Sequence, residues 1–381
     1  RKLNYQIDTL RGQRNTLSGE IKIAGNEEKQ EIIAQVKAIK DRLQLLEREY
    51  NKLKNVFDRL MLCVPSVPAP DVPVGKTDED NVFVRAVGEI PTFDFPMKDH
   101  VELALSLDLL DTERAVKFAG SRSYFLKNEG MLLEMAITRF VVDRLCAKGF
   151  TPMSVPLLVR ESAMTGTGYF PAGYEQAYKL PEDEQFLIGT SEVSLVSYHQ
   201  NEILKYEELL KKYAGYSTCF RREAGTYGKD TRGVYRVHQF QKVEQVILCE
   251  ADEEVMKALH NEILANSEEV LQALELPYRV MLACTSEIGI GQIKKHEIET
   301  WMPSRNAYCE THSCSSFGDF QARRSNIKYR DKDGVVKYCY TLNNTGIASP
   351  RILIPLLEIY QQEDGSIKIP KVLQPYMGGM E

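Results

Sequence analysis

The chain has 381 residues, of which 43% are hydrophobic and 27% charged, and its formal net charge is -6. This length suits two or three domains with a sizeable core, and the composition is that of a soluble globular protein. The net charge excludes a protein that coats nucleic acid through an overall basic surface. Residues 1–62, however, hold 13 Lys plus Arg against 9 Asp plus Glu, which predicts one basic segment facing a polyanion.

Cysteine spacing and hydrophobicity indicate a cytoplasmic protein. The eight cysteines form no CxxC pair and no His/Cys cluster with zinc spacing, so we predict free thiols and no structural zinc. The sequence contains no run of 18 apolar residues and no signal peptide, which predicts no membrane association. Because the chain starts at Arg1, within a heptad pattern and without Met, we expect native residues to precede it.

Residues 1–62 show the pattern of two long helices, because apolar residues recur at alternating steps of four and three. Ala24-Gly25-Asn26 interrupts the pattern, which predicts an antiparallel coiled-coil hairpin. Such a hairpin can be a basic arm that reaches RNA, or a coil that serves as a spacer or dimerisation element. The predicted seam comprises Leu3, Ile7, Leu10, Arg14, Leu17, Ile21, Ile32, Val36, Ile39, Leu43, Leu46, Tyr50, Leu53, Phe57 and Leu60.

Residues 63–82 predict a linker between this arm and the body of the protein, residues 83–381. The segment contains four prolines and ends in an acidic patch. Proline has no backbone N–H to donate in a helix, so an extended segment is expected.

The body begins with helices and short strands. Residues 100–120 predict one helix or two, residues 123–126 a short strand, and residues 131–148 a long amphipathic helix. Residues 150–158 predict a strand that contains Pro156, and a proline in a strand indicates a sheet edge or a bulge.

A glycine-bearing loop at residues 164–171 lacks the GxxxxGK[ST] phosphate cradle, so we place it at the rim of a site. An apolar strand end at residues 186–189 then leads into Thr190-Ser191-Glu192. Hydroxyl and carboxylate groups there can bind the hydroxyl and ammonium of a substrate. The alternative is a helix N-cap followed by an acidic first turn.

Residues 219–244 carry the most specific chemistry in the chain. Both flanks alternate apolar and charged residues, which predicts two strands joined by a basic, glycine-containing loop that includes Lys229. One face would carry Arg221, Glu223, Phe240 and Glu244. Arginine fits phosphate, and an aromatic ring can lie on a purine, so this face suits a nucleotide beside an amino acid. The alternative is an exposed hairpin with solvated charges.

The remaining elements are a cover helix at residues 251–275, strands at 277–285, 297–302 and 307–310, and a final motif at 342–354. Glu310 and Ser313 are an oxygen pair suited to Mg²⁺, and His312 is either catalytic or a packing residue. In the final motif Ser349 is predicted to cap a helix. Arg351 would then project from the first turn, where the helix dipole also favours phosphate.

These motifs together resemble the class II aminoacyl-tRNA synthetases. Phe220-Arg221-x-Glu223 with Arg236-Val237-His238-Gln239-Phe240 is similar to motif 2, residues 131–158 resemble motif 1, and residues 341–361 resemble motif 3. The sequence from Glu223-Ala224-Gly225 to Val243-Glu244-Gln245 is similar to that of the seryl-tRNA synthetase family, and the resemblance covers nearly the whole chain. It implies an α+β fold, in which helices flank an antiparallel sheet that carries the coiled-coil arm, and a homodimer formed through motif 1.

The resemblance also implies an activity and a set of site residues. The enzyme would activate L-serine with ATP to seryl-adenylate and transfer the seryl group to the 3′ end of tRNA(Ser), whose long variable arm the coiled coil would grip. Whether tRNA(Sec) is also charged stays open. The nucleotide and its Mg²⁺ would be bound by Arg221, Arg222, Glu223, Val237, His238, Gln239, Phe240, Glu310, Thr311, His312, Ser313 and Arg351. Serine would be bound by Thr190, Ser191, Glu192, Glu244, Asn343 and Thr345.

Individual roles follow from the same resemblance. Arg221 would contact the α-phosphate, Arg351 the γ-phosphate, and Glu310 with Ser313 the Mg²⁺ ion. Glu223 would accept a hydrogen bond from the adenine amine, and Phe240 would stack on the ring.

The sequence departs from the family at Ser286-Glu287, at His296 and at Thr311-His312, where the family often has Gly-Asp, Tyr and a small or apolar pair. Two other functions compete with the synthetase. A non-charging paralogue would bind RNA or a protein partner, but it would typically have lost Arg221, Glu223, Glu310 or Arg351. A relative that loads serine onto a carrier protein would not need the heptads of the arm.

Overall fold

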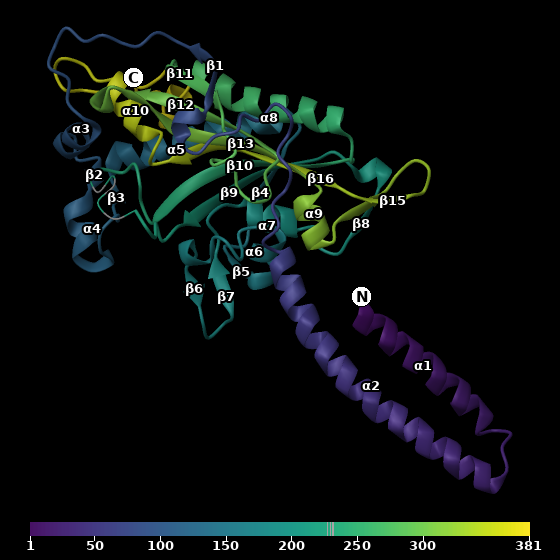
Figure 1. Ribbon diagram of the computed structural model, residues 1–381. Coiled ribbons are helices and arrows are strands. Elements are labelled where there is room, and N and C mark those ends of the chain that lie inside the picture. Colours follow the sequence, from purple (N-terminus) through teal and green to yellow (C-terminus); the bar gives the residue numbers. More distant parts are fainter. Residues whose placement is uncertain (227, 229, 231) are drawn as a thin grey trace. The chain divides into compact units, whose positions relative to one another are not determined.

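The computed structural model describes every residue except 227, 229 and 231, so the predicted loop residue Lys229 lies outside the described residues. The chain forms two compact units, Arg1–Val64 and Pro65–Glu381 (Figure 1). The boundary falls within the predicted linker, so most of that proline-rich segment belongs to the second unit.

The first unit consists of α1 (Lys2–Glu20) and α2 (Asn26–Met61), which run antiparallel as predicted (Figure 1). Ile7, Leu43 and Leu46 form its buried core. The predicted seam is packed as far as Tyr50, whereas Leu53, Phe57 and Leu60 are exposed. This difference follows from length, because the 19 residues of α1 pair with only part of the 36 residues of α2.

An eight-stranded sheet organises the second unit, in the order β1-β11-β12-β13-β16-β10-β9-β4. Neighbouring strands are antiparallel apart from β4 and β9, which are parallel. The predicted α+β fold is therefore confirmed. The strands are β1 (Val82–Val87), β4 (Thr151–Ser154), β9 (Lys211–Phe220), β10 (Gln239–Cys249), β11 (Tyr278–Leu282), β12 (Lys294–Met302), β13 (Ala307–Gly318) and β16 (Tyr340–Ser349).

The two faces of the sheet are covered differently. Alternation along β10 sends Ile247 into the main core and Val246 into a second, smaller core. The long helices α5 (Asn128–Ala147) and α8 (Glu253–Ala273) pack on the main core. Arg144 of α5 and Lys148, which caps its C-terminus, both pair with Glu269 of α8. The short helices α6 (Glu161–Gly166), α7 (Glu192–Ser197) and α9 (Phe320–Ser325) contribute to the smaller core.

Smaller elements complete the unit. The helices are α3 (His100–Ser106), α4 (Thr112–Ala119) and α10 (Leu353–Ile359), with 3-10 turns at Asp78–Asp80, Tyr174–Gln176, Tyr206–Glu208, Pro303–Arg305 and Gln374–Met377. The short strands pair as β2 (Leu110–Asp111) with β3 (Phe125–Leu126), β7 (Gln185–Leu187) with β5 (Leu158–Arg160) and β6 (Lys179–Leu180), and β14 (Lys328–Arg330) with β15 (Val336–Tyr338) and β8 (Ile203–Lys205).

The proline-rich segment at the start of the second unit is bound to the loop between β11 and β12. The backbone N–H of Ser66 donates to the Ile290 carbonyl at 2.8 Å, and that of Ala69 to the Ile293 carbonyl at 2.7 Å. Thr285 N–H donates to the Pro73 carbonyl at 2.9 Å. The segment is therefore held along the body rather than free.

Three local predictions were wrong. Residues 150–158 form β4 and the start of β5, and Pro156 lies between the two strands, where its carbonyl accepts from Ser194. The first flank of residues 219–244 is a strand only to Phe220, so Arg221 and Glu223 lie in the loop. Glu223 has a φ of +53°, in the left-handed region that ends regular pairing.

The third wrong prediction concerns the final motif. Ser349 is the last residue of β16, and its hydroxyl donates to Glu134 of α5 at 2.7 Å instead of capping a helix. Pairing between Gln241 and Ser349 extends the strand to this point, so α10 begins only at Leu353. Arg351 consequently lies in a turn ahead of the helix.

Candidate active site

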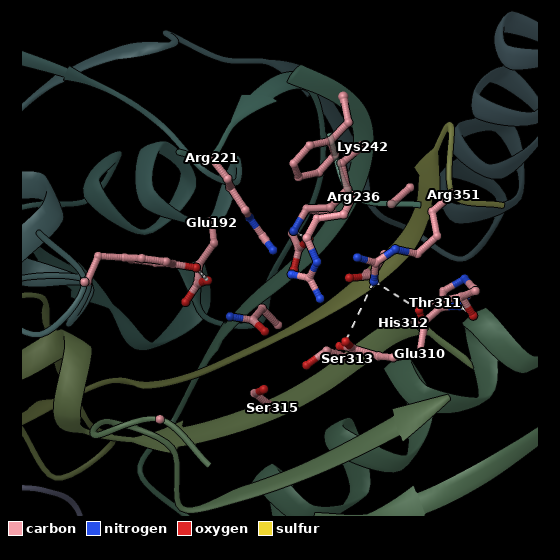
Figure 2. A pocket seen from close by; sticks show the side chains of 18 of the residues that line it. Glu192, Arg221, Arg236, Lys242, Glu310, Thr311, His312, Ser313, Ser315 and Arg351 are labelled. Atoms are coloured by element: carbon pink, nitrogen blue, oxygen red, sulfur yellow. Dashed lines mark hydrogen bonds and ion pairs between the residues drawn. The ribbon is translucent and has the colours of Figure 1, made fainter. Parts of the chain in front are cut away.

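A cavity of about 360 Å³ lies on the face of β10 that carries Phe240, Lys242 and Glu244. Its other walls come from β13, β16, the turn at residues 350–351 and the loops at residues 167–173, 234–237 and 289–292. Figure 2 shows Glu192 on one side of this cavity, Arg351 and Glu310 on the other, and Arg221 and Arg236 between them. Thirteen of the predicted site residues line it: Glu192, Arg221, Glu223, Val237, Phe240, Glu244, Glu310, Thr311, His312, Ser313, Asn343, Thr345 and Arg351.

Two buried carboxylates, Glu192 and Glu244, lie at the side of the cavity opposite Arg351 and Glu310. Glu192 accepts hydrogen bonds from the Tyr169 hydroxyl at 2.8 Å and from Gln321 Nε2 at 2.6 Å. Glu244 is 2% exposed and pairs with Lys242 Nζ. The oxygen in this ion pair is Oε2. Two buried carboxylates that face a single lysine leave this side of the cavity with an excess of negative charge, which favours an incoming cation.

The electrostatics of this side favour binding a positive charge. Burial, with the like charge of Glu244 adding to it, raises the pKa of Glu192 to about 7. An ammonium group placed between the two carboxylates would offset that repulsion and hold Glu192 in its ionised form.

The middle of the cavity carries an arginine, an aromatic ring and an ion pair. The Arg221 guanidinium carbon lies 5.2 Å from the Phe240 ring centroid, and Arg221 Nε donates to the Gly189 carbonyl at 3.3 Å. Glu223 accepts from Arg236 Nη1 at 2.9 Å. These groups can bind a phosphate and a flat heteroaromatic ring.

Arg351 lies beside Glu310, at the side of the cavity opposite Glu192. Its Nε donates to the Tyr235 carbonyl at 3.1 Å, its Nη1 donates to the Glu310 carbonyl at 3.0 Å, and Nη1 lies 3.7 Å from Glu310 Oε2. A permanent cation with a planar fork of donors, fixed at its edge by two carbonyls, suits a terminal phosphate.

A β-bulge in β13 brings the predicted magnesium ligands together. Ile298 of β12 pairs with His312 and Glu299 pairs with Glu310, which leaves Thr311 as the extra residue. The bulge shifts the alternation of side chains, so that Glu310, Ser313 and Ser315 all line the cavity. A carboxylate and a hydroxyl fit Mg²⁺ if nucleotide phosphates supply further oxygens.

Five predicted residues lie outside the cavity lining. Thr190 is buried and accepts from the Glu192 N–H at 3.3 Å, and the Ser191 hydroxyl donates to the Gly215 carbonyl at 3.3 Å. Thr190 therefore contacts the backbone of Glu192, and Ser191 is bonded to β9. Arg222 and His238 line a separate hollow, and Gln239 is exposed at the start of β10.

Of the positions that depart from the family pattern, His312 lies on the cavity face of the large sheet and His296 on the opposite face. Burial lowers the pKa of His312 to about 4, and its Nδ1 lies 2.9 Å from the Thr311 hydroxyl, so a neutral packing histidine fits this position. His296 is buried with its Nδ1 2.8 Å from His260 Nε2 of α8, on the face opposite the cavity. Ser286 and Glu287 are not among the lining residues.

Sequence reasoning missed several residues that line the cavity. Lys242 could have been found, because it alternates with Phe240 and Glu244 along one strand. Tyr235 adjoins the recognised Arg236, yet an aromatic residue in a loop carries no signal of its own. Gln292 and Ser315 were also missed, whereas Tyr169 belongs to the loop at residues 164–171 that was predicted to lie at the rim.

No helix among the described residues is long and apolar enough to cross a membrane. In the same part of the chain, no group of three or more His, Cys, Asp or Glu side chains is placed to hold a metal ion.

Two family models match the sequence. Residues 1–68 match "Seryl-tRNA synthetase N-terminal domain", and residues 176–360 match "tRNA synthetase class II core domain (G, H, P, S and T)". A serine–tRNA ligase of Deinococcus radiodurans is 46% identical over 379 residues, which cover 100% of this chain and 89% of that protein. One of Dictyoglomus turgidum is 45% identical over 380 residues, with 99% and 89% covered.

Solved structures agree with these matches. Seryl-tRNA synthetase from Pyrococcus horikoshii, complexed with ATP, superposes with a TM-score of 0.92 at 39% identity, covering 100% of this chain and 90% of that one. Cytoplasmic serine–tRNA ligase from Naegleria fowleri, in complex with AMP, gives a TM-score of 0.85 at 30% identity, with 100% and 90% covered. Identity above 40% over at least 99% of this chain, together with both family models, shows that the chain belongs to the seryl-tRNA synthetase family of class II aminoacyl-tRNA synthetases.

Proposed function

We propose that the protein is an ATP-dependent serine–tRNA ligase that works in two steps. The observation that carries the proposal is the order of groups along one cavity, with Glu192 and Glu244 first, Arg221 over Phe240 next, and Arg351 beside Glu310 last. This order matches an amino acid, a nucleotide and a polyphosphate laid end to end. The ATP and AMP named with two relatives support the same assignment.

In the first step the serine carboxylate attacks the α-phosphorus of ATP and pyrophosphate leaves. A carboxylate is already a nucleophile at neutral pH, so positioning and charge neutralisation account for the catalysis. Glu192 and Glu244 hold the ammonium, Arg221 the α-phosphate and Arg351 the γ-phosphate. Mg²⁺, held by Glu310 and Ser313, would neutralise charge on the phosphates. In the second step a ribose hydroxyl at the 3′ end of tRNA(Ser) takes the seryl group.

Serine-dependent exchange of pyrophosphate into ATP tests the first step, and charging of a tRNA panel that includes tRNA(Ser) and tRNA(Sec) tests the second. Exchange that does not depend on serine would reject the substrate, and its complete absence would favour a non-charging paralogue. All eight cysteines are free thiols, which supports a reducing, cytoplasmic location.

The affinity for serine is expected to depend on pH through Glu192. Its pKa of about 7 means that the carboxylate becomes protonated as the pH falls below that value. The ammonium then loses a partner, so KM for serine should rise by up to about tenfold per pH unit below 7, while KM for ATP changes little. Exchange kinetics between pH 5.5 and 8.5 measure both constants. A flat KM for serine across this range would show that Glu192 stays ionised, and Glu192→Gln should abolish the dependence.

We also propose a homodimer formed through α5. Met131, Leu132 and Met135 are exposed on this helix, and Phe125 of β3 is exposed close by in the chain. Large apolar side chains exposed together on one helix are typical of a protein interface. Replacing Met135 by Glu places a charge there and should weaken self-association by about 30-fold or more. Sedimentation velocity measures the change, Val335→Glu is the control at an exposed site elsewhere, and an unchanged dimer would place the interface on another surface.

A further inference from the structure

The Tyr235 ring is in contact with two arginine guanidinium groups. The guanidinium carbon of Arg351 lies 4.2 Å from its ring centroid, and that of Arg305 lies 4.1 Å from it. Arg351 follows β16, and Arg305 ends the 3-10 turn between β12 and β13. Both distances are well inside the range in which a cation is attracted to an aromatic face.

Tyr235 also fixes Arg351 through its backbone. The Tyr235 carbonyl accepts from Arg351 Nε at 3.1 Å, so one residue binds the guanidinium both at its edge and on its face. The hydrogen bonds described for this guanidinium use Nε and Nη1. Arginine has five N–H donors, so this arrangement keeps donors for an anion while removing much of the rotamer freedom of the side chain.

Arg305 is itself held in place, so it can support the ring. Its Nη2 donates to Asp230 Oδ1 at 2.8 Å, and Asp230 also pairs with Arg236 at 3.4 Å. Arg305 is not among the residues that line the cavity, whereas Tyr235 and Arg351 are.

We propose that Tyr235 is a positioning residue that holds Arg351 in the orientation needed for the terminal phosphates of ATP, with Arg305 as the support of its ring. The proposal rests on the assignment of ATP to this cavity. It concerns the polyphosphate end of the cavity, because Tyr235 contacts Arg351 and its hydroxyl donates to the Glu310 carbonyl at 3.4 Å.

Comparison of ATP with AMP separates this role from a general structural one. AMP lacks the β- and γ-phosphates, so losing the orientation of Arg351 should weaken ATP binding without affecting AMP. Tyr235→Leu in the full-length chain is expected to raise the dissociation constant of Mg·ATP by about tenfold and leave that of AMP within about twofold. KM for ATP should rise in parallel and KM for serine should not.

Two further variants complete the test. Tyr235→Phe keeps the ring and should restore ATP affinity to within about threefold of the parent protein. Arg305→Ala leaves the ring and removes its support, so it should shift ATP binding in the same direction by a smaller factor, and it provides the test if Tyr235→Leu does not fold. Tyr338→Leu is the control, because Tyr338 of β15 also has a cation, Lys328, 5.2 Å from its ring, outside the cavity.

Equal losses for ATP and AMP, or none in either Tyr235→Leu or Arg305→Ala, would overturn the proposal. These binding constants do not depend on serine. A parent protein that binds ATP more tightly than AMP but shows no serine-dependent exchange would contradict the proposed function and leave the test of Tyr235 intact.

Discussion

Replacing Arg221 by alanine is expected to lower the rate of serine-dependent pyrophosphate exchange by about 10²–10³-fold. Arg221 lines the middle of the cavity, with its guanidinium over Phe240 and its Nε bound to the Gly189 carbonyl. Negative charge grows on the α-phosphate during attack, and a fixed cation stabilises that charge more in the transition state than in bound ATP. The loss should therefore fall mainly on kcat.

The adjacent Arg222 provides a matched comparison. Its backbone N–H donates to the Gln176 carbonyl at 2.9 Å, and its Nη1 donates to the Glu175 carbonyl at 3.3 Å, outside the cavity. Arg222→Ala should therefore change exchange by less than about threefold, because a partly exposed hydrogen bond contributes little. Near-normal exchange by Arg221→Ala, or equal losses in the two variants, would reject the assignment of Arg221 to the α-phosphate. Thermal unfolding of both variants would separate lost catalysis from lost stability.

Removal of residues 1–60 is expected to separate the two half-reactions. The first unit has a hydrophobic core made of its own residues. The cavity residues assigned to adenylation all lie between Glu192 and Arg351, in the second unit. Exchange should therefore persist in the shortened protein. Residues 1–62 carry the basic excess of the chain, so tRNA affinity and charging should fall by about 10³-fold at low salt, and the remaining binding should depend less on salt.

The 381-residue and shortened proteins are compared in pyrophosphate exchange, in tRNA charging and in tRNA binding. Binding is measured between about 50 and 200 mM salt, because affinity that depends on phosphate contacts falls steeply in this range. Full-length protein with Lys37 and Lys40 replaced by Ala is the matched variant, since both residues are exposed on α2 and the helix remains. It should lower the salt slope by about 2 without affecting exchange. If the shortened protein charged tRNA(Ser) as well as the full chain, the arm would be a spacer or a dimerisation element.

The sequence predicted those features that depend on local periodicity. Heptad spacing located the two helices of the arm, because burial of Ile7, Leu43 and Leu46 requires that spacing. The grouping of Arg221, Phe240 and Glu244 followed from neighbouring motifs on one hairpin. Lys242 was recoverable from the same alternation.

Features that depend on pairing between distant strands could not be predicted. The bulge at Thr311 exists only in the register between β12 and β13, and without it simple alternation would place Glu310 and Ser313 on opposite faces. The start of α10 was misplaced for the same reason. Ser349-Pro350 is a good local helix start, but pairing with Gln241 keeps Ser349 in the strand.

The attachment of the proline-rich segment determines where this chain can be divided. The backbone of Ser66 and Ala69 is bonded to Ile290 and Ile293, and the residues from Gly289 to Gln292 form one wall of the cavity. A cut before Pro65 leaves these bonds in place, whereas a cut at residue 76 would remove them and free that wall. Because proline restricts backbone rotation, the segment is also stiff. The first residues after the arm are therefore part of the catalytic body. A force applied to the chain at Pro65 would be transmitted to the cavity wall through the hydrogen bonds of Ser66 and Ala69.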